Sequence, residues 1–472
     1  MRIGELEAEL GESRARIVEL EDRVAYLAGL VEEVRREGKR QAAPFRKTLK
    51  AKPERPGRKA GGGDGKHSFR RAPEREPDRV VPVRLPEACP GCGSGKLAVS
   101  KTVAQFVEDL PVTATVLTRF DVEIGRCECC RAKVQGRHPE QASDAYGAAA
   151  AQIGPRALAF AAYLHKVGGL SLGKTVAVLK ALGLTVTGGG LAQGFARLAA
   201  KGELTYQSLI GQIRDAPQVT ADETGWRVNA GPAWLWAFVA AQATIYAILP
   251  GRGFSDATMV LPRDFCGVLV RDGWAPYRQY RKAVHQSCLA HLLRRAGELC
   301  QTLPAEHQHI PRQLARILHD ALLCRGVRDQ GGYTDDQLGD TVAGLEARLD
   351  TLITTPASHA DTRRLLKHLA NEQAAILTFL YQPGVDATNW RGETGIRPAV
   401  VNRKVWGGNR TNRGADIQQI LMTLFRTAAQ QGRDIIDTFA ALLTSPTPTV
   451  ALHLTTPRRL KPHHNHPNTP TR

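Results

Sequence analysis

Two apolar runs of this sequence end in an acidic residue, and a third acidic residue follows much further along the chain. Asp222 ends the run that starts at Val219, Asp272 follows Val268-Leu269-Val270-Arg271, and Glu393 lies in a basic segment broken by glycines. A carboxylate at the end of a buried strand is costly to desolvate unless it is hydrogen-bonded or holds a cation. Two such strand ends indicate a metal site, and three carboxylates meeting there would suit two Mg²⁺ or Mn²⁺ ions.

Two metal ions about 3.5 to 4 Å apart can activate an attacking oxygen and stabilise the leaving oxygen of a phosphodiester, so these acids predict phosphoryl-transfer chemistry. Each acid also has a plainer interpretation. A single acid after an apolar run is commonly a solvated strand end or a helix cap, and Glu393 could pair with Arg397 four residues later. Glu223 competes with Asp222, but neighbours along a strand point to opposite faces, so only one of them should face the site.

The segment around and after Glu393 is rich in basic residues and contains two tryptophans. Guanidinium groups near catalytic carboxylates would bind the phosphates of a DNA end, and the indoles of Trp390 and Trp406 could stack on unpaired bases. The alternative is a basic loop held by acidic residues of the preceding helices. The candidate DNA-binding residues are Arg391, Arg397, Arg403, Lys404, Arg410 and Arg413.

Several short motifs surround the three acids. They are Ala221-Asp222-Glu223-Thr224-Gly225-Trp226-Arg227, Trp234-Leu235-Trp236, Arg271-Asp272-Gly273-Trp274 with Tyr277, Cys288-Leu289-Ala290-His291, Glu393-Thr394-Gly395-Ile396-Arg397-Pro398 and Arg403-Lys404-Val405-Trp406. Together they resemble the insertion-sequence-66 family of bacterial transposases, of the TnpC type, over nearly the whole chain. The resemblance implies a ribonuclease-H-like domain in which an Asp-Asp-Glu triad, here Asp222, Asp272 and Glu393, cuts transposon ends with divalent metal ions and joins them to target DNA.

The surroundings of Glu393 depart from the family pattern. An expected Asp-Asn-Asn run appears as Thr388-Asn389-Trp390, and the Arg that usually follows the Glu is Thr394. Gly392 should also weaken the helix on which the Glu is expected. A catalytically decayed DNA-binding derivative is therefore the alternative to an active transposase, and a nuclease without joining activity is a third hypothesis.

Two Cys-x-x-Cys pairs lie on either side of segments with alternating apolar residues. Cys89 and Cys92 form the first pair, and Cys127 and Cys130 form the second, with Cys129 as a spare thiol. Four thiolates at tetrahedral distance make a closed structural Zn²⁺ site, so a zinc ribbon is predicted. A redox-active pair is the alternative interpretation.

The first 37 residues follow a heptad pattern. β-branched residues dominate one apolar position and leucines the other, which favours a parallel two-stranded coiled coil and hence a homodimer. The alternative is a helix that packs on its own domain. The two heptad positions are occupied by Ile3, Leu10, Ile17, Val24 and Val31, and by Leu6, Ser13, Leu20, Leu27 and Val34.

The formal net charge of +18 predicts a polyanionic partner. Residues 39–79 contain 14 Lys and Arg against 5 Asp and Glu, and residues 458–472 add a further +4. Such arms would bind phosphates in a salt-dependent way, or would act only as solubilising linkers. No window is apolar enough to span a bilayer, and nine cysteines, an odd number, fit reduced thiols. A bacterial cytoplasmic protein associated with the nucleoid is expected.

We therefore predict an α/β protein with a ribonuclease-H-like mixed sheet. Helical segments before the sheet resemble a helix-turn-helix, although an ordinary packed helical hairpin fits nearly as well. Family analogy adds helper proteins encoded beside the transposase. The expected parts are a coiled coil (1–37), a basic disordered linker (38–80), a zinc ribbon (81–140), a helix-turn-helix-like region (141–213), a catalytic domain (214–443) with a helical insertion at about 300–384, and a disordered basic tail (444–472).

Overall fold

The structure is a computed structural model that describes residues 16–17, 73–74, 76–107, 115–141, 152–447 and 449–454. The chain divides into two units, residues 1–114 and residues 115–472, and each is described by itself. The predicted coiled coil and most of the basic linker lie outside the described residues. Within the described ranges, we find no helix whose length and apolar character would let it cross a membrane.

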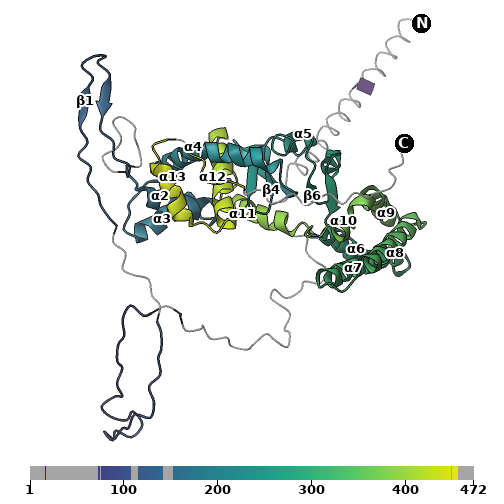
Figure 1. Ribbon diagram of the computed structural model, residues 1–472, viewed down its shortest axis with the longest axis horizontal. Coiled ribbons are helices and arrows are strands. Elements are labelled where there is room, and N and C mark those ends of the chain that lie inside the picture. The colour runs from purple at the N-terminus through teal and green to yellow at the C-terminus, as the bar shows by residue number, and fades with distance from the viewer. Residues whose placement is uncertain are drawn as a thin grey trace, which may run out of the picture. The chain divides into compact units, whose positions relative to one another are not determined.

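A five-stranded mixed sheet forms the centre of the second unit (Figure 1). Its order is β5-β4-β3-β6-β7; β3, β4 and β5 form an antiparallel meander, and β6 and β7 run parallel to β3. This mixed α/β arrangement is consistent with the expected ribonuclease-H-like architecture. The strands are β3 (Gln218–Val228), β4 (Gly231–Val239), β5 (Thr244–Leu249), β6 (Val268–Arg271) and β7 (Val284–Ser287).

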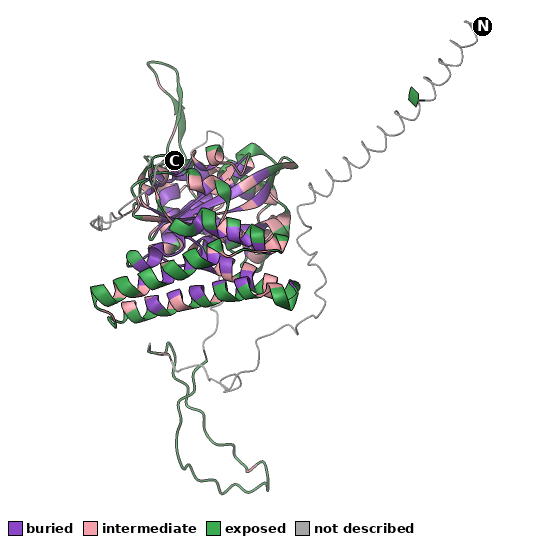
Figure 2. Cartoon of the chain, turned by 90° about the vertical axis from the view of Figure 1, so that its right-hand side faces the viewer, coloured by how far each residue is buried: buried purple, intermediate pink, exposed green. Residues whose placement is uncertain are grey.

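Local chemistry explains how the strands connect. The two-residue turn between β3 and β4 places Asn229 and Ala230 at φ of 50° and 61°, the left-handed conformation that matches the twist of a hairpin. All four residues of β6 are buried, as expected for a central parallel strand covered on both faces. In Figure 2 the strands are coloured mostly as buried, whereas the outer faces of the long helices are exposed.

Five helices from both ends of the unit pack together beside the β5 edge (Figure 1). Leu158, Leu198, Ile245, Phe425 and Phe439 all belong to one apolar core. The expected helix-turn-helix-like region therefore shares its core with the sheet, and the helix-turn-helix and the packed helical hairpin both stay predictions. The helices are α2 (Pro155–Lys166), α3 (Leu172–Ala181), α4 (Gly188–Ile213), α12 (Asn412–Gln430) and α13 (Ile435–Thr444).

A helical insertion follows β7. Its apolar core is separate from the one described above and also includes Val268 and Val270 of β6. Val342, Leu345, Leu349 and Leu352 are buried, as their helical spacing predicts. The first helix that contributes to this core, α6, begins directly after β7. Its helices are α6 (Leu289–Thr302), α7 (His309–Asp329), α8 (Asp335–Thr354), α9 (Ala360–Glu372) and α10 (Thr378–Tyr381).

Helix α11 (Trp390–Trp406) crosses the face of β3 and β4 and carries Glu393 in its first turn. A Cβ added to Gly392 would meet the Asn389 Oδ1 atom at 2.2 Å, and one added to Gly395 would meet a Val239 methyl group at 2.7 Å. Gly392, which the sequence marks as helix-weakening, and Gly395 are thus points where a larger side chain would clash with the start of the helix or with the sheet.

The remaining elements are short. Residues 449–454 fall in the segment expected to be a disordered tail, yet Leu452 is fully buried and the Leu454 N–H donates to Gln212 of α4. The short elements are β1 (Ile124–Arg126), β2 (Lys133–Gln135), α5 (Phe254–Ala257), and the 3₁₀ helices η1 (Ala275–Gln279), η2 (Ala305–His307) and η3 (Gln373–Ala375).

Candidate active site

Strand register sets Asp222 and Asp272 beside each other. Thr220 of β3 pairs with Val270 of β6 in a parallel ladder, and continuing that register by two residues brings Asp222 opposite Asp272. Parallel neighbours point to the same face when they are in register. The two predicted aspartates therefore meet, and the backbone alone is sufficient to bring them together.

The Asp222 carboxylate is held in an environment that disfavours its charge. Burial, followed by the nearby carboxylates of Glu223 and Asp272, raises its pKa to about 7, although the Glu223 N–H and His291 act in the opposite direction. The Glu223 N–H donates to Asp222 Oδ1 at 2.9 Å. A cation between the two aspartates would relieve this repulsion, so the residues fit a hard divalent metal ion.

Glu223 makes its contacts elsewhere, as strand alternation predicts. Its side chain, 1% exposed, accepts a hydrogen bond from Arg252 Nε at 2.6 Å and another from the Tyr277 hydroxyl. The Arg252 guanidinium in turn lies over the rings of Trp234 and Trp274, at 4.9 and 4.0 Å from their centroids. Both carboxylate oxygens of Glu223 are thus occupied by hydrogen bonds to Arg252 and Tyr277.

A buried ion-pair network holds the turn that carries Asp272. Glu372, at the end of α9, accepts from Arg271 Nη1 at 2.5 Å and from Arg278 Nη1 at 2.8 Å, and its side chain has no exposed area. Arg271 Nη1 also donates to the Asp272 carbonyl oxygen at 3.0 Å, and the Trp274 N–H donates to Asp272 Oδ1 at 2.9 Å. The sequence contains no local signal for Glu372, which lies 100 residues beyond the aspartate.

Glu393 lies on the surface at the start of α11. Its side chain is 47% exposed, with Oε1 at 3.8 Å from His291 Nε2 and 3.9 Å from Arg294 Nη2. Both distances exceed that of a hydrogen bond, so these contacts are electrostatic and weak. Placement of Glu393 depends on α11 as a whole, with no bond of its carboxylate to the sheet.

The Cys288-x-x-His291 motif lies between the aspartates and Glu393. Burial tends to raise the pKa of the Cys288 thiol, but His291 and the Asn389 N–H, which donates to the sulfur at 3.1 Å, outweigh this and lower it. The Cys288 side chain in turn raises the pKa of His291. Asn389, fully buried, also donates to the Ala221 carbonyl at 3.4 Å, so it joins the start of α11 to β3.

The three acids do not close into one ligand set in this structure. Across the described residues, no group of three or more His, Cys, Asp or Glu side chains is arranged to hold a metal ion. The structure brings Asp222 and Asp272 together and leaves Glu393 on the far side of His291. The predicted three-carboxylate magnesium site therefore remains a prediction.

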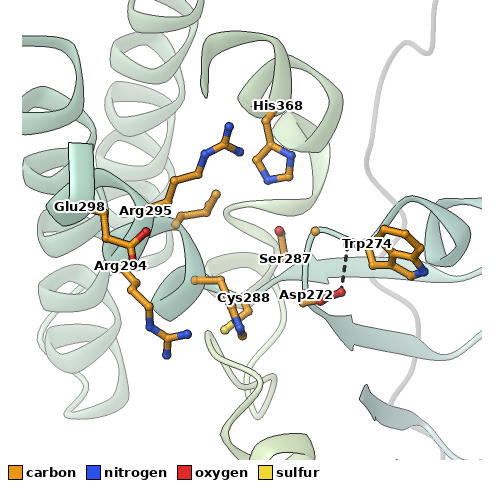
Figure 3. Close-up of a pocket in the computed structure, with 11 residues that line it drawn as sticks. Asp272, Trp274, Ser287, Cys288, Arg294, Arg295, Glu298 and His368 are labelled. Atoms are coloured by element: carbon orange, nitrogen blue, oxygen red, sulfur yellow. Dashed lines mark hydrogen bonds between the residues drawn. The ribbon is translucent and has the colours of Figure 1, made fainter. Parts of the chain in front are cut away.

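A cavity of about 460 Å³ opens beside Asp272 and is bounded mainly by α6 (Figure 3). Arg295 extends across it toward His368 of α9, and Cys288 lies close to Asp272. The lining residues are Asp272, Gly273, Trp274, Ser287, Cys288, His291, Leu292, Arg294, Arg295, Glu298 and His368. The insertion thus contributes one wall of the space in front of the second aspartate.

The six candidate DNA-binding residues divide into two groups. Arg403 donates to Thr224 and Gly225 of β3 at 2.9 and 2.5 Å, and Arg391 donates to Asp386 at 2.5 Å. These two are occupied in holding α11 and the segment before it. The side chains that remain exposed are Arg397, Lys404, Arg410 and Arg413.

The two cysteine pairs fall in separately described units, and each forms the same kind of turn. The Gly93 N–H donates to the Cys89 carbonyl at 2.8 Å, and the Arg131 N–H donates to the Cys127 carbonyl at 2.9 Å. Gly93 and Arg131 both have positive φ, 73° and 59°. Backbone N–H groups within each turn lower the pKa of Cys89 and of Cys127, which favours the thiolate that a metal ligand requires.

Comparison with known proteins adds one match. The family model "Transposase IS66 family" matches residues 150–417, which is more than half of the 472 residues and includes all three candidate acids. Among curated proteins, no sequence matches the chain at a significant level.

Proposed function

The chain belongs to the IS66 family of transposases, and on that basis we propose that it cuts the ends of an insertion sequence and joins them to target DNA. Membership implies an enzyme that binds and acts on DNA, in a family that generally uses divalent metal ions. The observation that carries the finer proposal is the strand register that sets Asp222 opposite Asp272.

Asp222 and Asp272 would hold the divalent cation, Mg²⁺ or Mn²⁺, and Glu393 would complete the set. When bound, the metal supplies activation of the attacking oxygen and stabilisation of the leaving one. The raised pKa of Asp222 supports this assignment, because two neighbouring carboxylates without a cation repel each other. His291, beside all three acids, would orient Glu393 toward them.

DNA contacts would come from the exposed basic residues that follow Glu393. Arg397, Lys404, Arg410 and Arg413 are free to approach phosphates, whereas Arg391 and Arg403 hold the protein scaffold. Cys89, Cys92, Cys127 and Cys130 would bind a structural Zn²⁺ ion, which the matching turns of the two pairs support. Dimerisation through residues 1–37, and helper proteins, complete the proposal.

The alternative is a DNA-binding derivative that no longer catalyses. It is favoured by the position of Glu393, which is 47% exposed and 3.8 Å from His291. A nuclease that cuts without joining would share the same three acids and would differ only in its products.

The test is Mg²⁺-dependent cleavage and joining of labelled duplexes taken from the two ends of the insertion element. The intact chain is compared with Asp222→Ala, Asp272→Ala and Glu393→Gln, and binding is measured in parallel. Loss of both reactions in all three variants, with binding retained, is expected. Activity that persists in Glu393→Gln would show that the third ligand is assigned wrongly. An intact chain that binds the ends and never cuts would favour the derivative, and cutting without joining would favour the nuclease.

A further inference from the structure

The cavity beside Asp272 combines the carboxylate of Asp272 with two arginines of α6. Asp272 lies at one side, and Arg294, Arg295 and His368 line the remainder together with Glu298. A cavity of about 460 Å³ lies within the range of roughly 300 to 1,000 Å³ that is typical of small-ligand sites. It is therefore larger than a single phosphate group requires and has room for a nucleotide.

Arg295 is the most informative residue of this cavity. Its side chain is half-buried, points toward His368 (Figure 3), and forms neither a hydrogen bond nor a salt bridge with any described residue. Its charge lowers the pKa of Asp361 and of His368 without a direct bond to either side chain. A half-buried guanidinium without an anion is costly, because its five donors in a fixed fork suit a carboxylate or a phosphate.

The surroundings of His368 show that this side of the cavity is electropositive. Burial lowers the pKa of His368, and the charges of Arg295, Arg278 and Arg271 lower it further, against the effect of Glu372. His368 also packs directly on the turn after Asp272, since a Cβ at Gly273 would meet its ring at 2.4 Å. An anion bound here would lie next to the candidate metal ligands.

We propose that this cavity binds one nucleotide of the DNA strand next to the cleaved bond, with its phosphate held by Arg295 and Arg294. The proposal rests on the proposed function and adds a role for the helical insertion, which supplies α6 and α9 as the walls of the subsite. The chemistry selects a phosphodiester: Arg295 offers a bidentate donor, and the carboxylate side of the cavity faces the position of the metal.

The experiment pairs a protein substitution with removal of a single phosphate charge. Methylphosphonate is placed at each phosphate within a few nucleotides of the cut in duplexes from the element ends, and binding in Ca²⁺ and cleavage in Mg²⁺ are measured. At one phosphate, methylphosphonate should weaken binding and cleavage by the intact chain about tenfold, the effect of losing a hydrogen bond to a charged group. The same substitution should have a smaller effect on Arg295→Ala, because the contact of Arg295 is already lost and only that of Arg294 remains.

Arg316→Ala is the matched control, since Arg316 is an exposed arginine of the same insertion that does not line the cavity. It should remain sensitive to the methylphosphonate, and Arg295→Ala alone should lower the salt dependence of binding by about one charge. Effects that add independently at every phosphate, or an Arg295→Ala variant that binds as the intact chain does, would overturn the subsite while leaving the transposase proposal in place. A chain that binds the ends and never cuts would contradict only the proposed cleavage, because the binding measurements with methylphosphonate and Arg295→Ala would still test the subsite.

Discussion

The two aspartates and the glutamate of the candidate site are positioned in different ways. Asp222 lies on β3 and Asp272 directly follows β6, and a ladder of backbone hydrogen bonds that joins these two strands ends at Thr220 and Val270, two residues before the aspartates. Glu393 lies on a helix whose approach to the sheet depends on two glycines and on the buried Asn389. Strand pairing thus supports the position of the aspartate pair, whereas helix packing supports the position of the glutamate.

That difference suits a metal-dependent site. In the proposed site, the two aspartates would hold the cation and Glu393 would complete the ligand set. Substitutions that weaken the contacts around the aspartates should therefore differ in effect from substitutions that weaken the contacts around Glu393. Damage to the aspartate side should change metal affinity, and damage to the glutamate side should change the rate at saturating metal.

The largest effect is expected from Glu372→Gln. This change keeps the side-chain shape but leaves Arg271 and Arg278 without their buried anion. Breaking a buried ion pair on one side costs about 3 to 5 kcal/mol of the free energy of unfolding, which urea denaturation would measure. The Mg²⁺ concentration for half-maximal cleavage should rise, because the Asp272 turn is no longer held. Glu306→Gln, at an exposed position of η2, is the control; equal effects of both changes would contradict the role of Glu372.

Gly392→Ala should disturb the glutamate side. An added methyl group would meet Asn389 Oδ1 at 2.2 Å and Thr220 Cγ2 at 3.1 Å, so overpacking should destabilise the fold by about 1 to 3 kcal/mol despite the better helix propensity of alanine. Cleavage at saturating Mg²⁺ should fall. Gly297→Ala in α6, where nothing lies within 4 Å of the new Cβ, should instead stabilise slightly. A Gly392→Ala variant as active and as stable as the intact chain would show that the added methyl group fits beside Asn389 and Thr220.

Asp222→Asn tests the repulsion within the aspartate pair. The folded-state pKa of Asp222 is raised to about 7 from 3.8. Stability is therefore lost as the pH rises from 3.8 through 7, because the unfolded chain ionises this group freely while the folded one resists. At pH 8 without metal, the variant should be more stable than the intact chain by about 1 to 2 kcal/mol and should lose cleavage. Exposed Asp264→Asn should change neither property, and a destabilised Asp222→Asn protein would contradict the argument.

Lys166→Met probes the anchor at the far end of α11 and should have the smallest effect. The Lys166 carbonyl accepts from Asn402 of α11 at 2.7 Å, and its Nζ donates to Gln418 at 2.6 Å in a buried site. Burial lowers the pKa of Lys166 from 10.5 to about 7.

The sign of the pH dependence follows from which state binds the proton. Between pH 7 and 10.5 the unfolded chain keeps the Lys166 proton that the folded chain releases, so stability should rise with pH by at most about 1.4 kcal/mol per unit. Lys166→Met should flatten that slope in urea unfolding at pH 7, 8 and 9, and Lys174→Met, at an exposed position of α3, should leave it unchanged. The same slope in both variants would mean that another group is responsible.

Much of the site followed from local patterns. Apolar runs that end in acid predicted that Asp222 and Asp272 lie at strand ends, and alternation along the first strand predicted that only one of Asp222 and Glu223 faces the site. The spacing of Val342, Leu345, Leu349 and Leu352 predicted a helix with one buried face, which α8 has. The departure at Thr388-Asn389-Trp390 was visible, but not that Asn389 would join α11 to β3 and to Cys288.

The amino-acid sequence by itself determined the family of this protein and the approximate positions of its strands, and it predicted Asp222, Asp272 and Glu393 as ligands of a divalent metal ion. Each of these follows from neighbours a few residues apart, where periodicity and burial leave a readable pattern. Only the tertiary structure decided that Glu372 holds the Asp272 turn and that Arg295 and His368 face a common cavity. Those partners lie on helices far apart in the chain, and their charges affect each other only after packing has excluded water and brought them within a few ångströms.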